Sequence, residues 1–286
     1  MLRPAIVRPV PVVVFVLAGL LAAGAARADA PAYNFSPVNL YNLQVSAGFW
    51  NPIIRYVSEK SGVRLNLKLG RTSADTTSYV LMREVDFAFT NHLFSPERAR
   101  MGWTVFGRRA AAPVQSQIVV PADSPIRRIE DLAGAAVAFP GPEAPLGYKI
   151  AYTQLYQRNI PVNVVFTGNT DAAFTQLFAG AVKAAGASSA LVASYHGREG
   201  KSFRVLWSST PFNDQALMAS PRVPPAQVRA VAQAFFGMDK DPEGRRILAD
   251  AAQLVHVPAP LAFIPATEAD FAAYRTFYAN APATVR

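Results

Sequence analysis

Hydrophobic spacing divides the chain into strands and helices that follow one another in turn. Residues 63–69 alternate apolar and polar side chains with a period of two, which predicts a half-buried strand. Before it, apolar side chains recur at helical spacing over residues 49–57, with Pro52 in the first turn and Gly62 as the expected C-cap. A first strand is expected at residues 38–41, so the order begins strand, helix, strand.

The same alternation continues to the C-terminus. The predicted strands after the first two are residues 86–89, 117–120, 135–139, 162–166, 182–185 and 203–207, followed by an extended segment at 211–218. The predicted helices after the first are residues 72–83, 145–157, 170–178, 189–196, 225–237, 242–252 and 268–278. Strands that alternate with helices imply an α/β fold built from right-handed βαβ units, each sheet being mostly parallel.

The alternation restarts after the strand at residues 117–120, which predicts two α/β lobes. Extended stretches near residues 120–122 and 208–213 are the expected crossings between them. We therefore expect a discontinuous first lobe, residues 31–120 and 212–286, and a continuous second lobe, residues 121–211. Two lobes joined by two crossing strands form a hinge with a cleft.

Residues 1–28 have the pattern of a secretory signal peptide. Basic residues precede an apolar run at positions 10–21, and small residues follow it. Cleavage is expected after Ala28 or Ala30. The run is too short and too interrupted by proline for a membrane span. We therefore expect an exported, periplasmic protein.

Composition narrows the classes of function. The chain is 51% hydrophobic and 16% charged, which is ordinary for a globular protein. The formal net charge is +9, but no basic run interleaves with aromatic residues, so a nucleic acid is not an expected partner. The chain has no cysteine, which excludes disulfides, thiolate metal sites and a lipid-modified cysteine at the cleavage site.

The sequence lacks the motifs of common catalytic and metal sites. The histidines are His92, His196 and His256, and none has metal-ligand spacing to another histidine. No nucleophile elbow, P-loop or dinucleotide fingerprint is present. We therefore expect no enzyme, no metal and no cofactor. His92 differs from the other two because it follows a strand, where α/β proteins bind ligands.

Residues 117–148 carry the frame on which ligand binding is predicted. The stretch reads as strand, one helical turn, second strand, Gly/Pro loop and helix start. A strand that ends in such a loop and feeds a helix presents free backbone N–H groups, which suit an anion or another polar ligand.

Several segments, taken in order, resemble the periplasmic substrate-binding proteins of phosphate/phosphite/phosphonate ABC transporters. The segments that carry the resemblance are IVVPADSPIRRIEDLAG, AFPGPEAPLGY, VVFTGNTDAAFTQLFAGAV, RVLWSSTPFND and DKDPEGRRIL. The resemblance implies two lobes of the type-II periplasmic-binding kind, closing on a small polar or anionic ligand. It also implies a monomer whose closed form docks onto an ABC permease in the inner membrane.

The resemblance breaks down at the loop that holds the ligand in this family. Members that bind phosphonates carry a Ser-Thr-Ser run before a Gly-Tyr pair, and here those positions are Ala144, Pro145 and Leu146. All three hydroxyls are absent, and Pro145 also lacks an N–H. Glu143 stands beside them, where a carboxylate would repel a bound anion. Tight binding of simple phosphate or phosphonate is therefore not expected.

The remaining family positions give the other candidate ligand contacts. Thr170 stands where the family often has histidine, and Asp214 matches an acidic position that faces the amine in aminophosphonate binders. Aromatic contacts of the family map to Tyr41 or Asn42 and to Phe94. The full set of expected ligand residues is Asn91, His92, Glu143, Tyr148, Asn169, Thr170 and Asp214.

Each candidate has a structural alternative. Glu143 can complement a helix dipole, Tyr148 can be a core tyrosine, and Asn169 can cap a helix. The function expected is a solute-binding protein that captures its ligand by hinge closure and delivers it to an ABC transporter. The alternatives are a ligand-sensing protein that signals to a membrane sensor kinase and an exported hydrolase. The absence of a nucleophile motif counts against the hydrolase.

Overall fold

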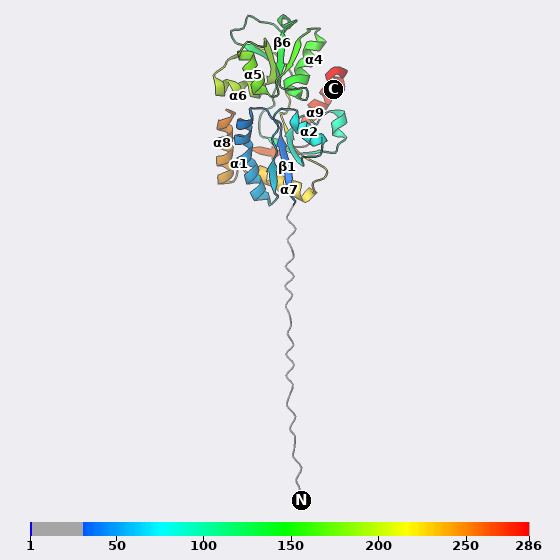
Figure 1. Cartoon of the computed structure of the whole chain (residues 1–286), viewed down its shortest axis with the longest axis vertical. Helices are drawn as coiled ribbons and strands as arrows, with labels where there is room; N and C mark the ends of the chain where they lie inside the picture. The colour runs from blue at the N-terminus through cyan, green and yellow to red at the C-terminus, as the bar shows by residue number, and fades with distance from the viewer. Residues whose placement is uncertain (2–30, 286) are drawn as a thin grey trace. The chain divides into compact units, whose positions relative to one another are not determined.

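The computed structural model describes Met1 and residues 31–285. Residues 31–285 form two sheets flanked by helices, one in each lobe (Figure 1). The first sheet has six strands in the order β11-β4-β10-β3-β1-β2. The second has five, in the order β7-β6-β8-β5-β9. The predicted signal peptide and its cleavage site lie outside the described residues.

The first lobe takes its elements from both ends of the chain. Its strands are β1 (Tyr33–Pro37), β2 (Leu65–Leu67), β3 (Phe87–Thr90), β4 (Thr104–Arg109), β10 (Ala216–Ala219) and β11 (Phe263–Pro265). Its helices are α1 (Leu43–Ser61), α2 (Asp75–Leu81), α3 (Pro96–Ala99), α7 (Pro225–Gly237), α8 (Pro242–Leu254) and α9 (Ala272–Asn280), with 3-10 turns at Glu268–Phe271 and Ala283–Val285.

The second lobe is continuous in sequence. Its strands are β5 (Ser116–Pro121), β6 (Ala136–Phe139), β7 (Asn163–Phe166), β8 (Ala184–Ser188) and β9 (Phe203–Ser208). Its helices are α4 (Ile150–Gln157), α5 (Thr170–Phe178) and α6 (Ser189–Glu199), with a 3-10 turn at Ile129–Leu132 and a π-helical turn at Pro145–Lys149.

Alternation along the central strands gives each sheet two buried faces. In β3, Phe87 and Phe89 join a core with Trp50 and Phe235, whereas Ala88 belongs to a second core on the opposite face. Successive side chains of a strand point to opposite faces, so one strand serves both cores. The first core packs α1, α7 and α8 against the sheet, and the second includes residues of α9.

The sheets are mixed, which corrects the expectation that each is mostly parallel. Strands β1, β2 and β3 pair in parallel, but β10 runs antiparallel to both β3 and β4. In the second sheet, β6 is parallel to β7 and β8, whereas β5 is antiparallel to β8 and β9. The antiparallel strands flank the crossings, where the chain enters and leaves a sheet without a helical crossover.

The boundary between the lobes lies earlier than residue 120. Strand β5 pairs with β8 and β9, so residues 116–121 belong to the second sheet and not to the first lobe. The chain crosses at residues 110–115 and returns at 209–215. These segments pair at one point, where the N–H and carbonyl of Val114 and Phe212 exchange hydrogen bonds of 2.7 and 2.8 Å.

Several predicted elements have different bounds in the structure. The first strand is β1 and not residues 38–41, which follow it toward the second lobe. Helix α1 begins at Leu43 on the N-cap Asn42, so Pro52 lies inside the helix and not in its first turn. The short strands β4 and β11 were not predicted from the sequence. Among the described residues, no helix is both long and apolar enough to cross a membrane.

Candidate functional site

A cavity of about 30 Å³ lies between the lobes, at the edge where the central strands of both sheets end. Its first-lobe wall follows β1 and β3 and precedes β10, and its second-lobe wall follows β6 and β8. Loops at the ends of strands converge at such an edge in open α/β sheets. The lining residues are Val38, Leu40, Ser73, Asn91, His92, Pro140, Ala144, Pro145, Leu146, Gly147, Thr170, Ser188, Leu191, Asp214 and Gln215.

Asn91 and His92, two of the predicted ligand residues, lie in this wall, and both are buried. The Asn91 side-chain amide donates to the Tyr274 hydroxyl at 3.1 Å, and that hydroxyl donates to the carbonyls of Asn213 and Asp214 at 2.8 and 2.9 Å. Asn91 is thereby held by helix α9, which packs behind the wall.

His92 is uncharged at neutral pH. Burial, together with the positive charges of Arg98 and Lys149, lowers the pKa of its imidazole to about 3. Its Nδ1 lies 3.0 Å from the Thr77 hydroxyl, which fixes the ring. His92 can therefore offer a neutral ring nitrogen to the cavity but no positive charge.

Asp214 lines the cavity but already has a charge partner. Its carboxylate accepts from the Arg109 guanidinium at 2.6 Å, and the two side chains are 14% and 13% exposed. Arg109 ends β4 and Asp214 precedes β10, the strand paired with β4. The pair brings no net charge to the site, so Asp214 is not a free counter-charge for an amine.

The second-lobe wall contains the loop that lacks hydroxyls. Ala144, Pro145 and Leu146 line the cavity, and the π-helical turn begins at Pro145. Leu146 is 3% exposed and packs in the same core cluster as Phe94 and Tyr274 of the first lobe. Leu146 thus presents an apolar side chain at the cavity wall.

Thr170 and Ser188 bring the starts of two helices to the same wall. Thr170 is the first residue of α5 and is 2% exposed, and Ser188 is the N-cap of α6, accepting from the Leu191 N–H at 3.4 Å. The positive ends of both helices therefore face the cavity, which favours an electron-rich group there.

Glu143 and Arg98 join the lobes beside the cavity. The Glu143 carboxylate lies 2.6 Å from the Arg98 guanidinium, with side chains 25% and 17% exposed. Arg98 also donates to the His92 carbonyl at 2.9 Å. Glu143 is thus an interlobe ion-pair partner and does not line the cavity.

Tyr148 and Asn169 lie outside the cavity. The Tyr148 ring packs edge-on against Phe139 and Phe166, with ring centroids 5.1 and 4.9 Å apart, at the edge of the second lobe's core. Asn169 caps α5, accepting from the Ala172 N–H at 2.9 Å. Tyr148 is thus a packing residue and Asn169 a helix cap.

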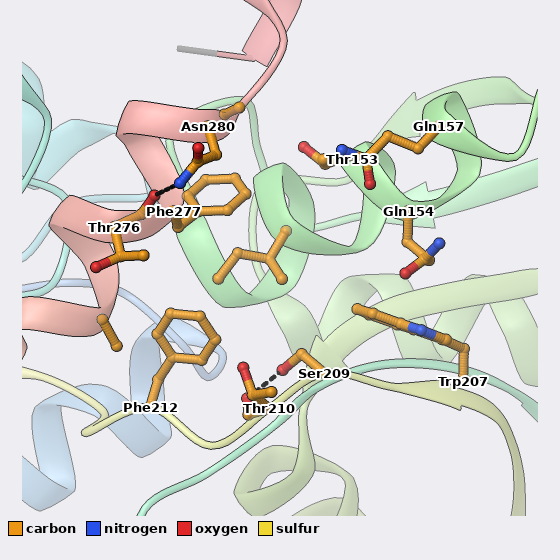
Figure 2. Close-up of a pocket in the computed structure, with 13 residues that line it drawn as sticks. Thr153, Gln154, Gln157, Trp207, Ser209, Thr210, Phe212, Thr276, Phe277 and Asn280 are labelled. Carbon is orange, nitrogen blue, oxygen red and sulfur yellow. Dashed lines mark hydrogen bonds between the residues drawn. The ribbon is translucent and has the colours of Figure 1, made fainter.

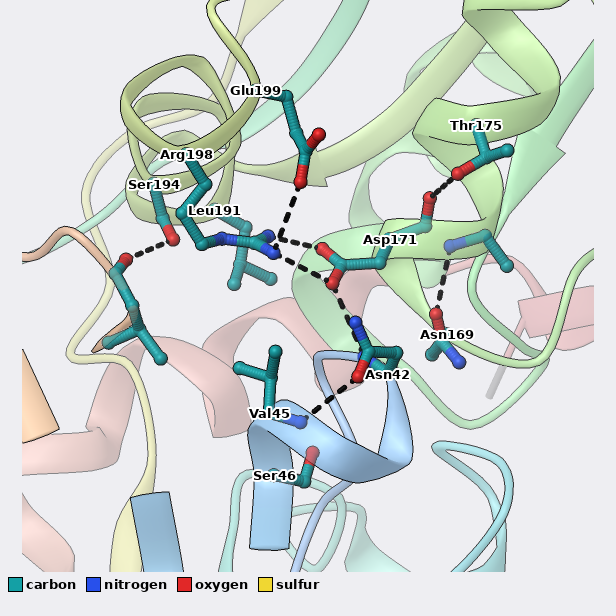
Figure 3. Close-up of polar contacts among 12 residues, drawn as sticks. Asn42, Val45, Ser46, Asn169, Asp171, Thr175, Leu191, Ser194, Arg198 and Glu199 are labelled. Atoms are coloured by element: carbon teal, nitrogen blue, oxygen red, sulfur yellow. Dashed lines mark hydrogen bonds and ion pairs between the residues drawn. The ribbon is translucent and has the colours of Figure 1, made fainter. Parts of the chain in front are cut away.

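A second contact between the lobes is centred on Asp171 (Figure 3). Its carboxylate accepts from Arg198 at 2.5 and 3.1 Å and from the backbone N–H of Asn42 at 3.2 Å. Arg198 also lies over the Tyr41 ring at 5.3 Å. Asp171 and Arg198 belong to the second lobe, whereas Tyr41 and Asn42 lead into α1 of the first.

A larger cleft of about 460 Å³ lies on the hinge side, between α4, α9 and the returning crossing segment (Figure 2). Figure 2 shows Trp207, Phe212 and Phe277 around it, with Gln154 and Asn280 at its edges. Its lining has no charged side chain. Its walls come from both lobes and from the crossing segment, so any rotation of one lobe against the other would change its width.

Sequence reasoning missed several residues that form the site. Ser73, Ser188 and Gln215 line the cavity, and Arg109 neutralises Asp214. Gln215 is adjacent to the predicted Asp214, which was a usable signal, whereas Ser73 comes from a loop with no motif. Within residues 31–285, no three histidine or acidic side chains gather as a metal site.

Comparison with known families identifies a match over most of the chain. Residues 38–271 match the family model described as "ABC transporter, phosphonate, periplasmic substrate-binding protein". No curated protein matches the sequence significantly.

Solved structures with similar folds include binding proteins of the same kind. A binding-protein component of an ABC phosphonate transporter from Pseudomonas aeruginosa has a TM-score of 0.74 at 17% identity, over 86% of this chain and 85% of that one. A Prochlorococcus marinus protein in complex with methylphosphonate has a TM-score of 0.70 at 14% identity, over 87% and 96%. A Xanthomonas citri protein bound to ATP has a TM-score of 0.66 at 13% identity, over 87% and 96%. These likenesses show the shared type-II periplasmic-binding fold.

Proposed function

Because the chain belongs to the family of periplasmic substrate-binding proteins of phosphonate ABC transporters, we propose that it captures a small polar ligand in the interlobe cavity and delivers it to an ABC permease. The family is a transport component and not an enzyme, and its location is periplasmic. The main observation behind the proposal is that residues of both lobes line the cavity. A ligand held there touches both lobes only when they are closed.

The contacts beside the cavity support capture by closure. Besides the pairs Arg98–Glu143 and Asn42–Asp171, the Ser73 N–H donates to the Gly168 carbonyl at 2.7 Å, and the Ser73 hydroxyl donates to the Pro140 carbonyl at 3.3 Å. All of these bonds cross between the lobes. The arrangement is therefore a closed one, and opening about the hinge at Val114 and Phe212 would break them together.

The ligand that fits this cavity differs from a simple phosphate or phosphonate. Among the described lining residues, Asp214 is paired with Arg109, and His92 is neutral. The loop at residues 144–146 supplies no hydroxyl. Lost hydrogen bonds in a buried site cost about 1–3 kcal/mol each, so three missing donors lower anion affinity by several powers of ten. We infer a small ligand held by Asn91, His92 and Thr170 together with backbone groups.

The test is to identify the ligand and to observe closure. The mature protein, purified without denaturation, is analysed by native mass spectrometry for a bound small molecule, and small-angle scattering compares its radius of gyration with and without that molecule. We expect a bound species whose removal opens the lobes. A ligand at about a hundred times its dissociation constant also stabilises the fold by about 2.7 kcal/mol in a thermal-shift screen. Sub-micromolar affinity for phosphate or methylphosphonate in isothermal titration would contradict the altered-loop inference.

A further inference from the structure

Behind the interlobe cavity lies a second, smaller one of about 20 Å³ inside the first lobe. It is lined by side chains that include Tyr41, Trp50, Phe89 and Arg109. The two cavities share Val38, Leu40 and Gln215 in their walls. The inner cavity thus adjoins the outer one, and the Gln215 side chain, 2% exposed, stands between them.

Two residues that line the inner cavity, Gln215 and Arg109, each carry a buried polar atom without a partner. The side-chain carbonyl oxygen of Gln215 and the Nε of Arg109 are both buried, and neither makes a hydrogen bond within the described part of the chain. Arg109 uses its terminal nitrogen for Asp214, which leaves the Nε–H free. Burying a polar group without a hydrogen-bond partner costs free energy. An unpaired acceptor and an unpaired donor at one cavity therefore favour a bound group that hydrogen-bonds to both.

The two orphan atoms restrict the chemistry of that occupant. It must accept a hydrogen bond from Arg109 Nε–H and donate one to Gln215 Oε1. A hydroxyl does both, whereas an ammonium group cannot accept and a carboxylate cannot donate. The volume of the inner cavity, about 20 Å³, suits one hydroxyl, because a cavity needs about 10–15 Å³ to hold one water-sized group. An ammonium group would also lie beside the Arg109 guanidinium, and like charges repel.

We propose that the inner cavity is a subsite that takes a hydroxyl group of the ligand, so that the ligand is a small hydroxylated acid. This inference rests on the proposed binding function. The hydroxyl would enter past Gln215, and the acid group would remain in the outer cavity. There the starts of α5 and α6 at Thr170 and Ser188 present their positive ends.

The experiment compares probes that differ by one group. Isothermal titration of the mature protein uses two series: methylphosphonate, hydroxymethylphosphonate and aminomethylphosphonate; and acetate, glycolate and glycine. We expect the hydroxylated member of at least one series to bind at least tenfold more tightly than its methyl and ammonium counterparts, the worth of one well-placed buried hydrogen bond. Gln215→Met, which keeps the shape but removes the acceptor, should reduce this preference to less than about threefold on the same scale.

Gln227 offers a matched control. Its side-chain carbonyl oxygen is also buried and without a partner, but it lies in α7 and lines neither cavity. Gln227→Met should therefore leave the hydroxyl preference unchanged. Equal unfolding midpoints of the two variants in urea show that a lost preference does not come from lost folding.

Four results of these experiments would overturn the proposal, and a fifth comes from the identity of a co-purified ligand. They are equal binding of hydroxylated and methyl probes, a preference that survives Gln215→Met, no binding of any probe, and a ligand-bound crystal structure in which the inner cavity holds only water. The binding function itself fails differently, through the absence of any small molecule that closes the lobes. A co-purified ligand without a hydroxyl would refute the hydroxyl subsite but not the proposed binding function.

Discussion

The carboxylate of Glu143 lies 2.6 Å from the guanidinium of Arg98, and this ion pair joins the second lobe to the first beside the interlobe cavity. Glu143 precedes the loop whose hydroxyls are missing, and Arg98 also holds the carbonyl of His92 in the cavity wall. An acidic residue that would repel an anion in the open cleft thus has a different role when the lobes meet. Its charge stabilises closure.

Glu143→Gln should shift the protein toward its open form. Breaking a fully buried ion pair costs about 3–5 kcal/mol, and because these side chains are 25% and 17% exposed we expect about 1–2 kcal/mol. Small-angle scattering of the variant should give a larger radius of gyration than the parent. Asp250→Asn breaks an exposed pair within α8, where both side chains are about two-thirds exposed at 65% and 66%, and should change neither shape nor stability. An unchanged radius in Glu143→Gln would contradict the role of the pair in closure.

Asp171→Asn should destabilise the fold more than Glu143→Gln does. Asp171 accepts two hydrogen bonds from Arg198 and one from the Asn42 N–H, and its side chain is 11% exposed and that of Arg198 is 9% exposed. Glu199 stays 3.9 Å from Arg198 but is 50% exposed, so removing the buried counter-charge of Asp171 still costs about 3 kcal/mol. Urea unfolding should show this loss.

Arg198→Met provides the second arm of a double-mutant cycle with Asp171→Asn. If the two residues act through each other, the double variant should lose less stability than the sum of the two single variants, by about 1–3 kcal/mol. Strict additivity would show that the pair does not contribute through its contact.

Stability should rise with pH between about 3 and 6.5 because of His92. The unfolded chain binds a proton on this ring below its ordinary pKa of 6.5, whereas the folded protein holds the ring neutral down to about 3. The stabilisation is therefore complete above pH 6.5 and is lost as the pH falls. Lowering the pH from 7 to 5.5 should cost roughly 1 kcal/mol from this group.

His92→Asn should reduce the slope of unfolding free energy against pH over the range 5 to 7. The comparison is made by urea unfolding at each pH, so that other titrating groups cancel between parent and variant. His196→Asn is the control, since that residue is exposed and its Nδ1 contacts only a nearby carbonyl. A parent slope no steeper than that of His92→Asn would refute the burial argument.

Ala144→Ser combined with Pro145→Thr should raise affinity for methylphosphonate by at least tenfold. The double substitution returns two hydroxyls and one backbone N–H to the cavity wall, and each recovered hydrogen bond contributes about 1 kcal/mol or more. Isothermal titration checks the gain. Leu146→Ser should bring none, because Leu146 is 3% exposed and its loss from the interlobe core weakens the closed form. No gain in the double variant would show that the missing hydroxyls are not what limits anion binding.

Local signals in the sequence were enough to define many of the elements. Helices α5 and α7 begin and end at the predicted residues, and Gly62 caps α1 with a φ of 67°. Family segments also indicated the fold class. Strands β4 and β11 carry no clear alternation between polar and apolar residues, which is why they were missed. Strand β5 was predicted near its observed place but assigned to the other lobe, because strand pairing depends on residues distant in the chain.

The candidate site likewise includes residues that local sequence signals could place and residues that they could not. Asn91, His92 and Thr170 line the interlobe cavity, because the ends of strands and the starts of helices face this edge of the sheets. Tyr148 does not, since the direction of its ring was set by packing against Phe139 and Phe166. A π-helical turn at the start of that helix has no local signal in the sequence.

The sequence by itself determined the two α/β lobes, the family and the loss of hydroxyls at residues 144–146, because periodicity, caps and motifs are written in neighbouring residues. Only the tertiary structure decided which charges are free. Glu143 is paired with Arg98, and Asp214 with Arg109, across 45 and 105 residues of chain. Such pairs form where separate strands and lobes meet. The unpaired polar atoms of Gln215 and Arg109 likewise arise only in the folded protein, where burial makes a missing partner costly.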